Sequence, residues 1–245
     1  MTETRAIARS APFDRNRGLL FAGLIGVAWI VMHIYAVFVL DIAERPWLAL
    51  AIGAALVWLY VGLFIVAHDA IHETLFGRGN LWNRRVGKLI HFIYAGFDFD
   101  RMRVAHLDHH AYSGTVDDPD FNAAHPDRFG PWFLSFLLQY FGWRQIAILT
   151  VAAAVYLLLG ARVENILLMW AVPSILSAVQ LFTFGTYLPH RHASAFADAH
   201  NARSNAYPAW LSLLTCFHFG YHHEHHLYPH EPWWRLPVRR REALV

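Results

Sequence analysis

The chain has 245 residues (28.1 kDa), of which 56% are hydrophobic and 16% charged, and its mean hydropathy is +0.30. This composition indicates a membrane protein, and the length suits one domain covering residues 1–245, while a formal net charge of +2 gives no support for nucleic-acid binding. The single cysteine, Cys216, excludes an intramolecular disulfide framework and a cysteine-based zinc or iron–sulfur site.

The N-terminal part of the chain predicts a helical hairpin in the membrane. A polar, arginine-containing tail (residues 1–17) shows no signal-peptide h-region or cleavage site. Residues 18–40 and 47–67 are each long enough to cross a hydrocarbon core of roughly 30 Å as a helix. Only the short turn at 41–46 separates them, so the second helix brings His68 to the side of the membrane where the N-terminus lies.

The middle of the chain, residues 68–131, is much more polar. Its apolar segment at 89–97 is too short for a span, and we expect it to lie in the membrane interface or to re-enter the bilayer.

Apolar residues return after Pro131 and are interrupted at 142–144. We expect an interfacial helix first, then a third span at 145–160 and a fourth at 165–188. Pro173 lies inside the fourth span and predicts a kink, which neighbouring helices can accommodate.

The basic residues predict the orientation of these four spans. Arg45 and Arg162 would lie on the far side, and the other 18 of the 20 Lys and Arg residues on the side of the N-terminus. This asymmetry follows the positive-inside rule. We therefore expect a multi-pass protein of the inner (cytoplasmic) membrane, with both termini and the histidine-rich segments on the cytoplasmic side.

Seventeen histidines dominate the chemistry of the chain. Most of them fall in clusters, and nine are candidate metal ligands: eight because their spacing places them on shared helix faces, and His190 because it follows the fourth predicted span on the same side of the membrane. These nine are His68, His72, His106, His109, His110, His190, His222, His225 and His226. A chance histidine patch explains one such cluster and explains three of them badly.

The assignment of His190 has two rivals, His192 and His200, which follow the fourth span on the same side. Further histidines have other expected roles: His33 and His91 are structural, and His125 and His230 lie in loops. Candidates for support of the ligands are Asp69, Asp117, Asp118 and His218, because metal-bound histidines usually donate their second N–H to a neighbouring group. Asp108, Asp120 and Glu224 are other carboxylates near the clusters.

The number of imidazoles exceeds the four positions of a zinc site and indicates two ions. Imidazole without thiolate suits iron, copper, zinc or nickel, so the ligand type alone leaves the metal open. Two irons at a membrane surface are suited to activating O2.

The histidine clusters resemble the three histidine boxes of the membrane fatty acid desaturase and hydroxylase superfamily. The boxes are HDAIH at 68–72, HLDHH at 106–110 and HHEHH at 222–226. Two longer strings, FGTYLPHRHASAFADAHNARS at 184–204 and FGYHHEHHLYPHEPWWRLP at 219–237, are more specific and resemble the bacterial β-carotene ketolases. The string at 106–121, HLDHHAYSGTVDDPDF, also resembles that family.

This resemblance implies a non-heme di-iron oxygenase with about four transmembrane helices. The implied reaction converts the C4 methylene of a β-ionone ring to a ketone, from β-carotene to echinenone and canthaxanthin, with zeaxanthin to astaxanthin as a further candidate conversion. It requires two successive hydroxylations and a dehydration, hence O2 and external electrons. The resemblance also strengthens His190 as a ligand, because the superfamily draws a further histidine from the last span before the third box.

The chain carries no G-x-G-x-x-G or P-loop, so electrons should come from a separate carrier, a ferredoxin with its reductase. Basic residues are candidates to dock this carrier, or else to meet anionic lipid: Arg84, Arg85, Lys88 and Arg239 to Arg241. Apolar residues that could shape a ring pocket, or only pack, are Phe97, Phe99, Leu188, Phe217 and Tyr221.

Two kinds of alternative remain open at this stage. The first is another enzyme of the superfamily: a carotenoid 3-hydroxylase, an alkane hydroxylase or a fatty acid desaturase. The second is a metal transporter, which should carry ionisable residues near the bilayer midplane. Here only His33 lies within a predicted span, which favours the enzyme.

Overall fold

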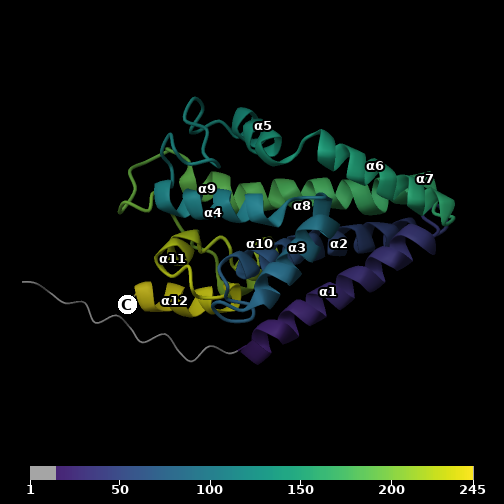
Figure 1. Cartoon of the computed structure of the whole chain (residues 1–245), viewed down its shortest axis with the longest axis horizontal. Coiled ribbons are helices and arrows are strands. Elements are labelled where there is room, and N and C mark those ends of the chain that lie inside the picture. The colour runs from purple at the N-terminus through teal and green to yellow at the C-terminus, as the bar shows by residue number, and fades with distance from the viewer. Residues whose placement is uncertain (1–14, 245) are drawn as a thin grey trace, which may run out of the picture.

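The computed structural model describes residues 15–244, and all helices and turns discussed below lie in this range. Every regular element among these residues is a helix, which confirms the predicted all-α class. Most of the predicted polar tail, residues 1–14, lies outside the described residues, as does Val245. The long helices run side by side (Figure 1).

The first hairpin consists of α1 (Arg15–Phe38) and α2 (Pro46–Ile71), both long and apolar enough to cross a membrane. The predicted hairpin is therefore confirmed. Helix α2 packs against α1, α3 and α8 and forms the centre of the molecule. It continues one turn beyond the predicted boundary, so His68 is helical and His72 is its C-cap.

The fourth predicted span is one continuous helical stretch from Val163 to His190. It is divided into α7 (Val163–Asn165), the π-helix η1 (Ile166–Ala171), α8 (Val172–Phe182), the π-helix η2 (Thr183–Tyr187) and α9 (Leu188–His190). Each π-helix ends two residues before a proline, Pro173 or Pro189. A proline ring clashes with the carbonyl four residues earlier, and a local i→i−5 pattern relieves this clash. The helical stretch therefore continues past both prolines.

The segment before it forms α5 (Phe129–Tyr140) and α6 (Trp143–Leu158), which are bent by 77° relative to each other. This break confirms the predicted interruption at 142–144. Three helical stretches qualify singly as spans, and the bent pair adds a fourth if it counts as one broken span. With 16 residues, α6 alone is shorter than the roughly 20 that a straight span needs.

The far turns of the two hairpins are joined at the end opposite the histidines (Figure 1). Arg162 forms an ion pair of 2.7 Å with Asp41. The buried Asn165 donates from Nδ2 to the carbonyl oxygens of Ala36 and Leu40, both at 2.8 Å. These bonds satisfy carbonyls that the end of α1 leaves free, and they fix the register between α1 and the last span.

The remaining helices lie at the other end: α3 (Leu81–Ala95), α4 (Phe99–Tyr112), α10 (Ala209–Cys216), α11 (His222–Leu227), the 3₁₀ helix η3 (Trp233–Arg235) and α12 (Leu236–Ala243). Asn80 and Asp98 cap the N-termini of α3 and α4 with their side chains. Gly96, at φ +68°, makes the left-handed turn between these two helices, where a Cβ would meet Ile148 at 2.9 Å.

Two histidines predicted to be structural have hydrogen bonds away from the clusters. His33 lies 3.0 Å from the Tyr156 hydroxyl and stacks on Trp29. His91 donates from Nδ1 to the Gly87 carbonyl at 2.9 Å. Both contacts agree with the expected structural role.

Candidate metal centre

Four helices bring the nine predicted ligands together at one end of the molecule. They are the end of α2, the second half of α4, α9 and α11. The nine histidines form two groups, and within each group the candidate ligand atoms all lie within 4.8 Å of one another. We call them the five-histidine group (His68, His72, His106, His110, His225) and the four-histidine group (His109, His190, His222, His226).

The Nε2 atoms of the five-histidine group face one another. His106 Nε2 lies 2.8 Å from His68 Nε2, 2.8 Å from His72 Nε2 and 3.1 Å from His110 Nε2. A neutral imidazole nitrogen carries either one proton or one lone pair, so hydrogen bonds cannot satisfy three such neighbours at once. In the other group His222 and His226 approach to 3.1 Å through the same atoms.

A metal ion accounts for this convergence, because every lone pair then points inward. Imidazole nitrogens bound at about 2.0–2.1 Å from a first-row ion stand roughly 2.8–3.0 Å apart in octahedral and roughly 3.3–3.4 Å apart in tetrahedral geometry. The observed nitrogen separations, 2.8–3.1 Å, are close to the octahedral values. Two separate groups of all-imidazole donors therefore fit two ions.

The structure divides each triad between the two groups, although the spacing alone suggested three nitrogens on one face. His106 and His110 share the five-histidine group, whereas His109 belongs to the other. Likewise His222 and His226 stay together and His225 joins the first group. Neighbouring residues on an α-helix point about 100° apart, so consecutive histidines reach different ions, while residues four apart reach the same one.

Asp118 supports the four-histidine group from outside. Its buried carboxylate accepts the Nδ1–H of His109, 3.0 Å from each oxygen, and also the N–H groups of Gly114 at 2.8 Å and Asp120 at 2.9 Å. This bond fixes the ring of His109 and leaves its Nε2 for the group. Asp118 thus occupies the supporting position expected from the sequence.

The geometry favours His190 over its two rivals. His190 is buried and donates from Nδ1 to the Asn201 carbonyl at 2.8 Å, while its Nε2 is buried without a hydrogen-bond partner. His192 is exposed and packs against Phe121, and His200 stays outside both groups. An imidazole held through one nitrogen with the other directed at the group has the arrangement of a ligand.

The five-histidine group has no comparable support. The nearest carboxylate, Asp69, lies 3.9 Å from His68 Nδ1, too far for a hydrogen bond. Three of its members are only partly buried. A polar hollow of about 550 Å³, lined among others by His72, Arg103 and His230, opens beside it.

Two further predicted supporting residues lie apart from the ligands. Asp117 is exposed, and among residues 15–244 no hydrogen bond joins it to a histidine, so the structure does not place it in a supporting position. His218 is buried, but its ring stacks on Tyr221 and Trp233 and not on a member of either group.

Burial favours the neutral form of most candidate ligands by lowering their pKa. Burial and the neighbouring imidazoles lower the pKa of His106, His110, His222, His225 and His226. His109 differs: burial opposes its protonation, but the Asp118 carboxylate outweighs it and raises the pKa. Metal binding requires neutral imidazole, so the site favours the form that can coordinate an ion.

Glu224 has a role that the sequence did not show. Its side chain is fully buried and bonds to Ser204 and, at 2.9 Å, to Arg240. Glu224 therefore ties the six-residue helix α11 to α12. At the start of α11, a Cβ on Gly220 would lie 2.0 Å from Asn205 Nδ2, so any larger residue there would displace the Asn205 side chain.

Several basic residues suggested for partner docking are engaged within the chain. Arg239 is buried and bridges Glu231 and Glu242, and Arg240 pairs with Glu224. Arg84 and Lys88 both pair with Asp100 on the surface, at 2.9 and 2.8 Å. The structure thus assigns Arg239 and Arg240 to internal packing.

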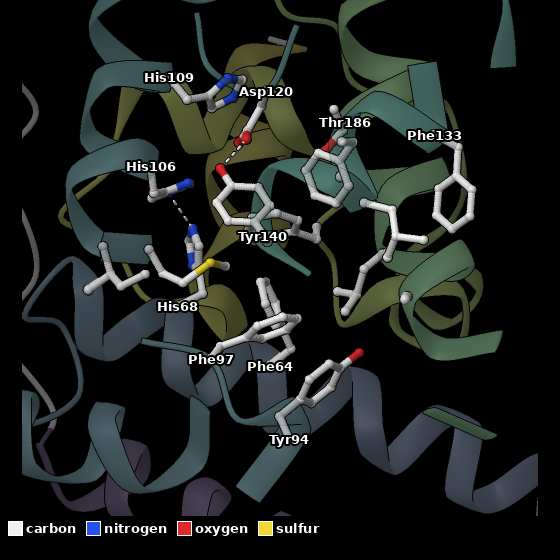
Figure 2. A pocket seen from close by; sticks show the side chains of 18 of the residues that line it. Phe64, His68, Tyr94, Phe97, His106, His109, Asp120, Phe133, Tyr140 and Thr186 are labelled. Atoms are coloured by element: carbon white, nitrogen blue, oxygen red, sulfur yellow. Dashed lines mark hydrogen bonds between the residues drawn. The ribbon is translucent and has the colours of Figure 1, made fainter. Parts of the chain in front are cut away.

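An apolar cavity of about 100 Å³ lies against the histidines. His68, His106 and His109 lie on one side of it (Figure 2), His222 also lines it, and most of the rest comes from aromatic and aliphatic side chains. These are Phe64, Ile71, Tyr94, Phe97, Met102, Phe133, Phe136, Leu137, Ala178, Leu181 and Phe219. Of the five pocket residues suggested by the sequence, only Phe97 lines this cavity.

The polar groups of the cavity include Asp120, Tyr140 and Thr186 (Figure 2). The Tyr140 hydroxyl donates to the Asp120 carboxylate. Burial raises the pKa of Asp120 to about 6, although the charge of His109 and the bond from Tyr140 act in the opposite direction. Sequence reasoning had noted Asp120 only as a nearby carboxylate, because its contact with Tyr140 joins residues 20 positions apart.

The chain is similar to proteins of one family, as a family model and individual relatives both show. The fatty acid desaturase family model matches residues 45–150 and 138–244. A β-carotene ketolase from Paracoccus sp. (strain N81106 / MBIC 01143) is 49% identical over 228 residues, covering 92% of this chain and 93% of the relative. A second, from Paracoccus sp. (strain PC1), is 47% identical and covers 92% of each chain.

The similarity extends to algae. A β-carotene 4-ketolase from Haematococcus lacustris is 38% identical over 227 residues, which is 90% of this chain and 66% of the relative. No solved structure matches the chain. The chain therefore belongs to the fatty acid desaturase family and, within it, to the β-carotene ketolases, and it is an oxidoreductase.

Proposed function

We propose that this protein is a β-carotene 4-ketolase, which converts the C4 methylene of a β-ionone ring to a ketone. The observation that carries the proposal is the apolar cavity whose wall includes histidines of both groups, in a chain 49% identical to a β-carotene ketolase. A hydrocarbon ring suits such a largely apolar cavity, and its C4 can then approach the histidines.

The cofactors in this proposal are two non-heme irons, one in each histidine group. The ligands are His68, His72, His106, His110 and His225 for one ion, and His109, His190, His222 and His226 for the other. Bound iron would supply the activation of O2 that hydroxylation of the allylic C4–H bond requires. The all-imidazole donor set and its nitrogen separations support this assignment.

The chain itself contributes binding, orientation and the exclusion of water. Phe64, Phe97, Phe133 and Phe136 surround the ring, and Asp118 fixes His109. Each hydroxylation uses one O2, two electrons and two protons, inserts one oxygen at C4 and releases one water. After the second round C4 carries two hydroxyls, and loss of water gives the ketone.

The four electrons come from outside the chain, and we propose a ferredoxin with its reductase as the donor. The carotenoid reaches the cavity from the membrane, since the spans are apolar and the substrate partitions into lipid. We further propose that the whole chain forms one domain in the inner membrane, with the histidine groups and both termini on the cytoplasmic side. Arg45 and Arg162 lie in turns at the end of the molecule away from the histidine groups, which supports this orientation.

Pigment chromatography tests the function directly. Bacteria that make β-carotene should produce echinenone and canthaxanthin when they express this chain, and a His225→Ala variant should leave β-carotene unchanged. Pigments hydroxylated at C3 instead would identify a carotenoid 3-hydroxylase of the same superfamily. Unchanged β-carotene despite verified expression, iron loading and electron supply would refute the carotenoid assignment.

A further inference from the structure

The cavity beside the histidines contains one carboxylate, that of Asp120. It faces a wall made largely of aromatic and aliphatic side chains, and there it accepts a hydrogen bond from the Tyr140 hydroxyl (Figure 2). Removing a carboxylate from water is costly unless its oxygens find hydrogen-bond donors. An acidic group in an otherwise apolar cavity therefore needs an explanation.

The local fold does not depend on this carboxylate. The turn that carries Asp120 is held through its main chain, because Trp132 Nε1 donates to the Asp120 carbonyl at 2.7 Å. The Asp120 N–H donates to Asp118 at 2.9 Å. Tyr140 bonds to Oδ1, and no side chain within residues 15–244 donates to Oδ2. A carboxylate can accept several hydrogen bonds, so capacity for another donor remains.

The proposed reaction supplies such a donor. The starting ring is a hydrocarbon, but after the first hydroxylation it carries a hydroxyl on C4. Asp120 lines the same cavity as His106 and His109, where C4 must lie to react. We propose that Asp120, positioned by Tyr140, binds the hydroxyl of the C4 alcohol and retains this intermediate for the second hydroxylation. This inference rests on the proposed ketolase function and extends it to the partly oxidised substrate.

Retention matters because the alcohol is still mainly a hydrocarbon and can return to the lipid. A hydrogen bond to a charged acceptor strengthens binding of the alcohol by roughly ten- to a hundredfold. It does not strengthen binding of the unoxidised ring, which has no hydroxyl. The carboxylate therefore acts between the two oxidation rounds. Loss of Asp120 should release alcohol while leaving the first hydroxylation in place.

The test compares the ratio of C4 alcohol to C4 ketone made from β-carotene. Asp120→Leu removes the acceptor at similar size, and we expect the ratio to rise roughly tenfold or more. Tyr140→Phe removes only the positioning hydroxyl and should raise the ratio less. Asp117→Asn, which alters an exposed carboxylate of the same turn outside the cavity, is the matched control and should leave the ratio unchanged. Iron content and the amount of protein in the membrane identify folded variants.

A second variant guards against misfolding of Asp120→Leu. Asp120→Asn keeps the shape with a weaker, neutral acceptor and should raise the ratio in the same direction. An unchanged ratio in the folded Asp120 variants overturns the inference, as does an equal rise in Asp117→Asn. A defect confined to substrates that already carry a 3-hydroxyl also overturns it. The unmodified enzyme shows which proposal has failed. If it makes no C4-oxygenated pigment, the proposed ketolase function fails; if it makes the ketone but the Asp120 variants do not change the ratio, only the role of Asp120 fails.

Discussion

The two histidine groups lie side by side but are held in different ways. The four-histidine group is completely buried, and two of its rings are fixed from behind, His109 by Asp118 and His190 by the Asn201 carbonyl. The five-histidine group has one more imidazole, yet three of its members are partly exposed. No hydrogen bond within residues 15–244 fixes the second nitrogen of its rings, and a polar hollow adjoins it.

This difference separates two ways of building a metal site. The four-histidine group relies on outer partners that orient its rings before an ion binds. The five-histidine group relies on the number of its donors and on their attachment to the long helices α2 and α4. We infer that the first site is the more rigid and the second the more accessible, and the following experiments test this contrast.

The largest effect should come from removing one ligand of either group. His109→Ala and His225→Ala should both abolish ketone formation, because the reaction needs both ions, and each variant should lose the iron of its own group. Product chromatography and metal analysis of the purified variants measure this. Full activity in either variant would show that the histidine in question is not a ligand.

A second experiment defines the membership of the four-histidine group. His190→Ala should reduce activity severely, since Nε2 of His190 is buried and directed at the group, whereas His192→Ala should be mild. The two histidines are two positions apart, so His192→Ala controls for disturbance of this segment. The reverse order of activities would show that the extra ligand has been assigned wrongly.

A third experiment removes outer support without removing a ligand. Asp118→Asn should lower iron affinity at the four-histidine group by roughly 10–100-fold, because the carboxylate no longer orients His109. Asp117→Asn alters the exposed neighbour and should change nothing. Metal titration of both variants separates the effects. Equal losses in both would mean that the charge of the turn matters and not the bond to His109.

The sequence predicted much of this arrangement because its strongest patterns are local. Apolar length predicted α1, α2 and the last span, and the spacing of His106 and His110 on one helix face predicted that they act together. The break between α5 and α6 followed from an interruption in the apolar run. These features depend on residues close in the chain.

What the sequence could not predict depends on contacts between distant segments. The division of each triad between two groups requires α4 and α11 to meet at a particular angle. The pairing of Asp120 with Tyr140 and the bridge from Glu224 to Arg240 arise only after the helices pack. The docking role suggested for Arg239 was wrong for the same reason, since a basic sequence does not reveal the acidic partners that bury it.

The smallest effect concerns the rate at which the two groups lose metal. A water-soluble chelator should remove iron in two phases, the faster from the five-histidine group, because that group adjoins the polar hollow and is partly exposed. His72→Ala should remove or accelerate the fast phase alone, and Asp118→Asn should accelerate the slow phase alone. A single phase, or a slow phase that responds to His72→Ala, would contradict the contrast in access. If the fast phase responds to His72→Ala and the slow phase to Asp118→Asn, the exposure of each group, and not its number of donors, governs how quickly its ion is lost.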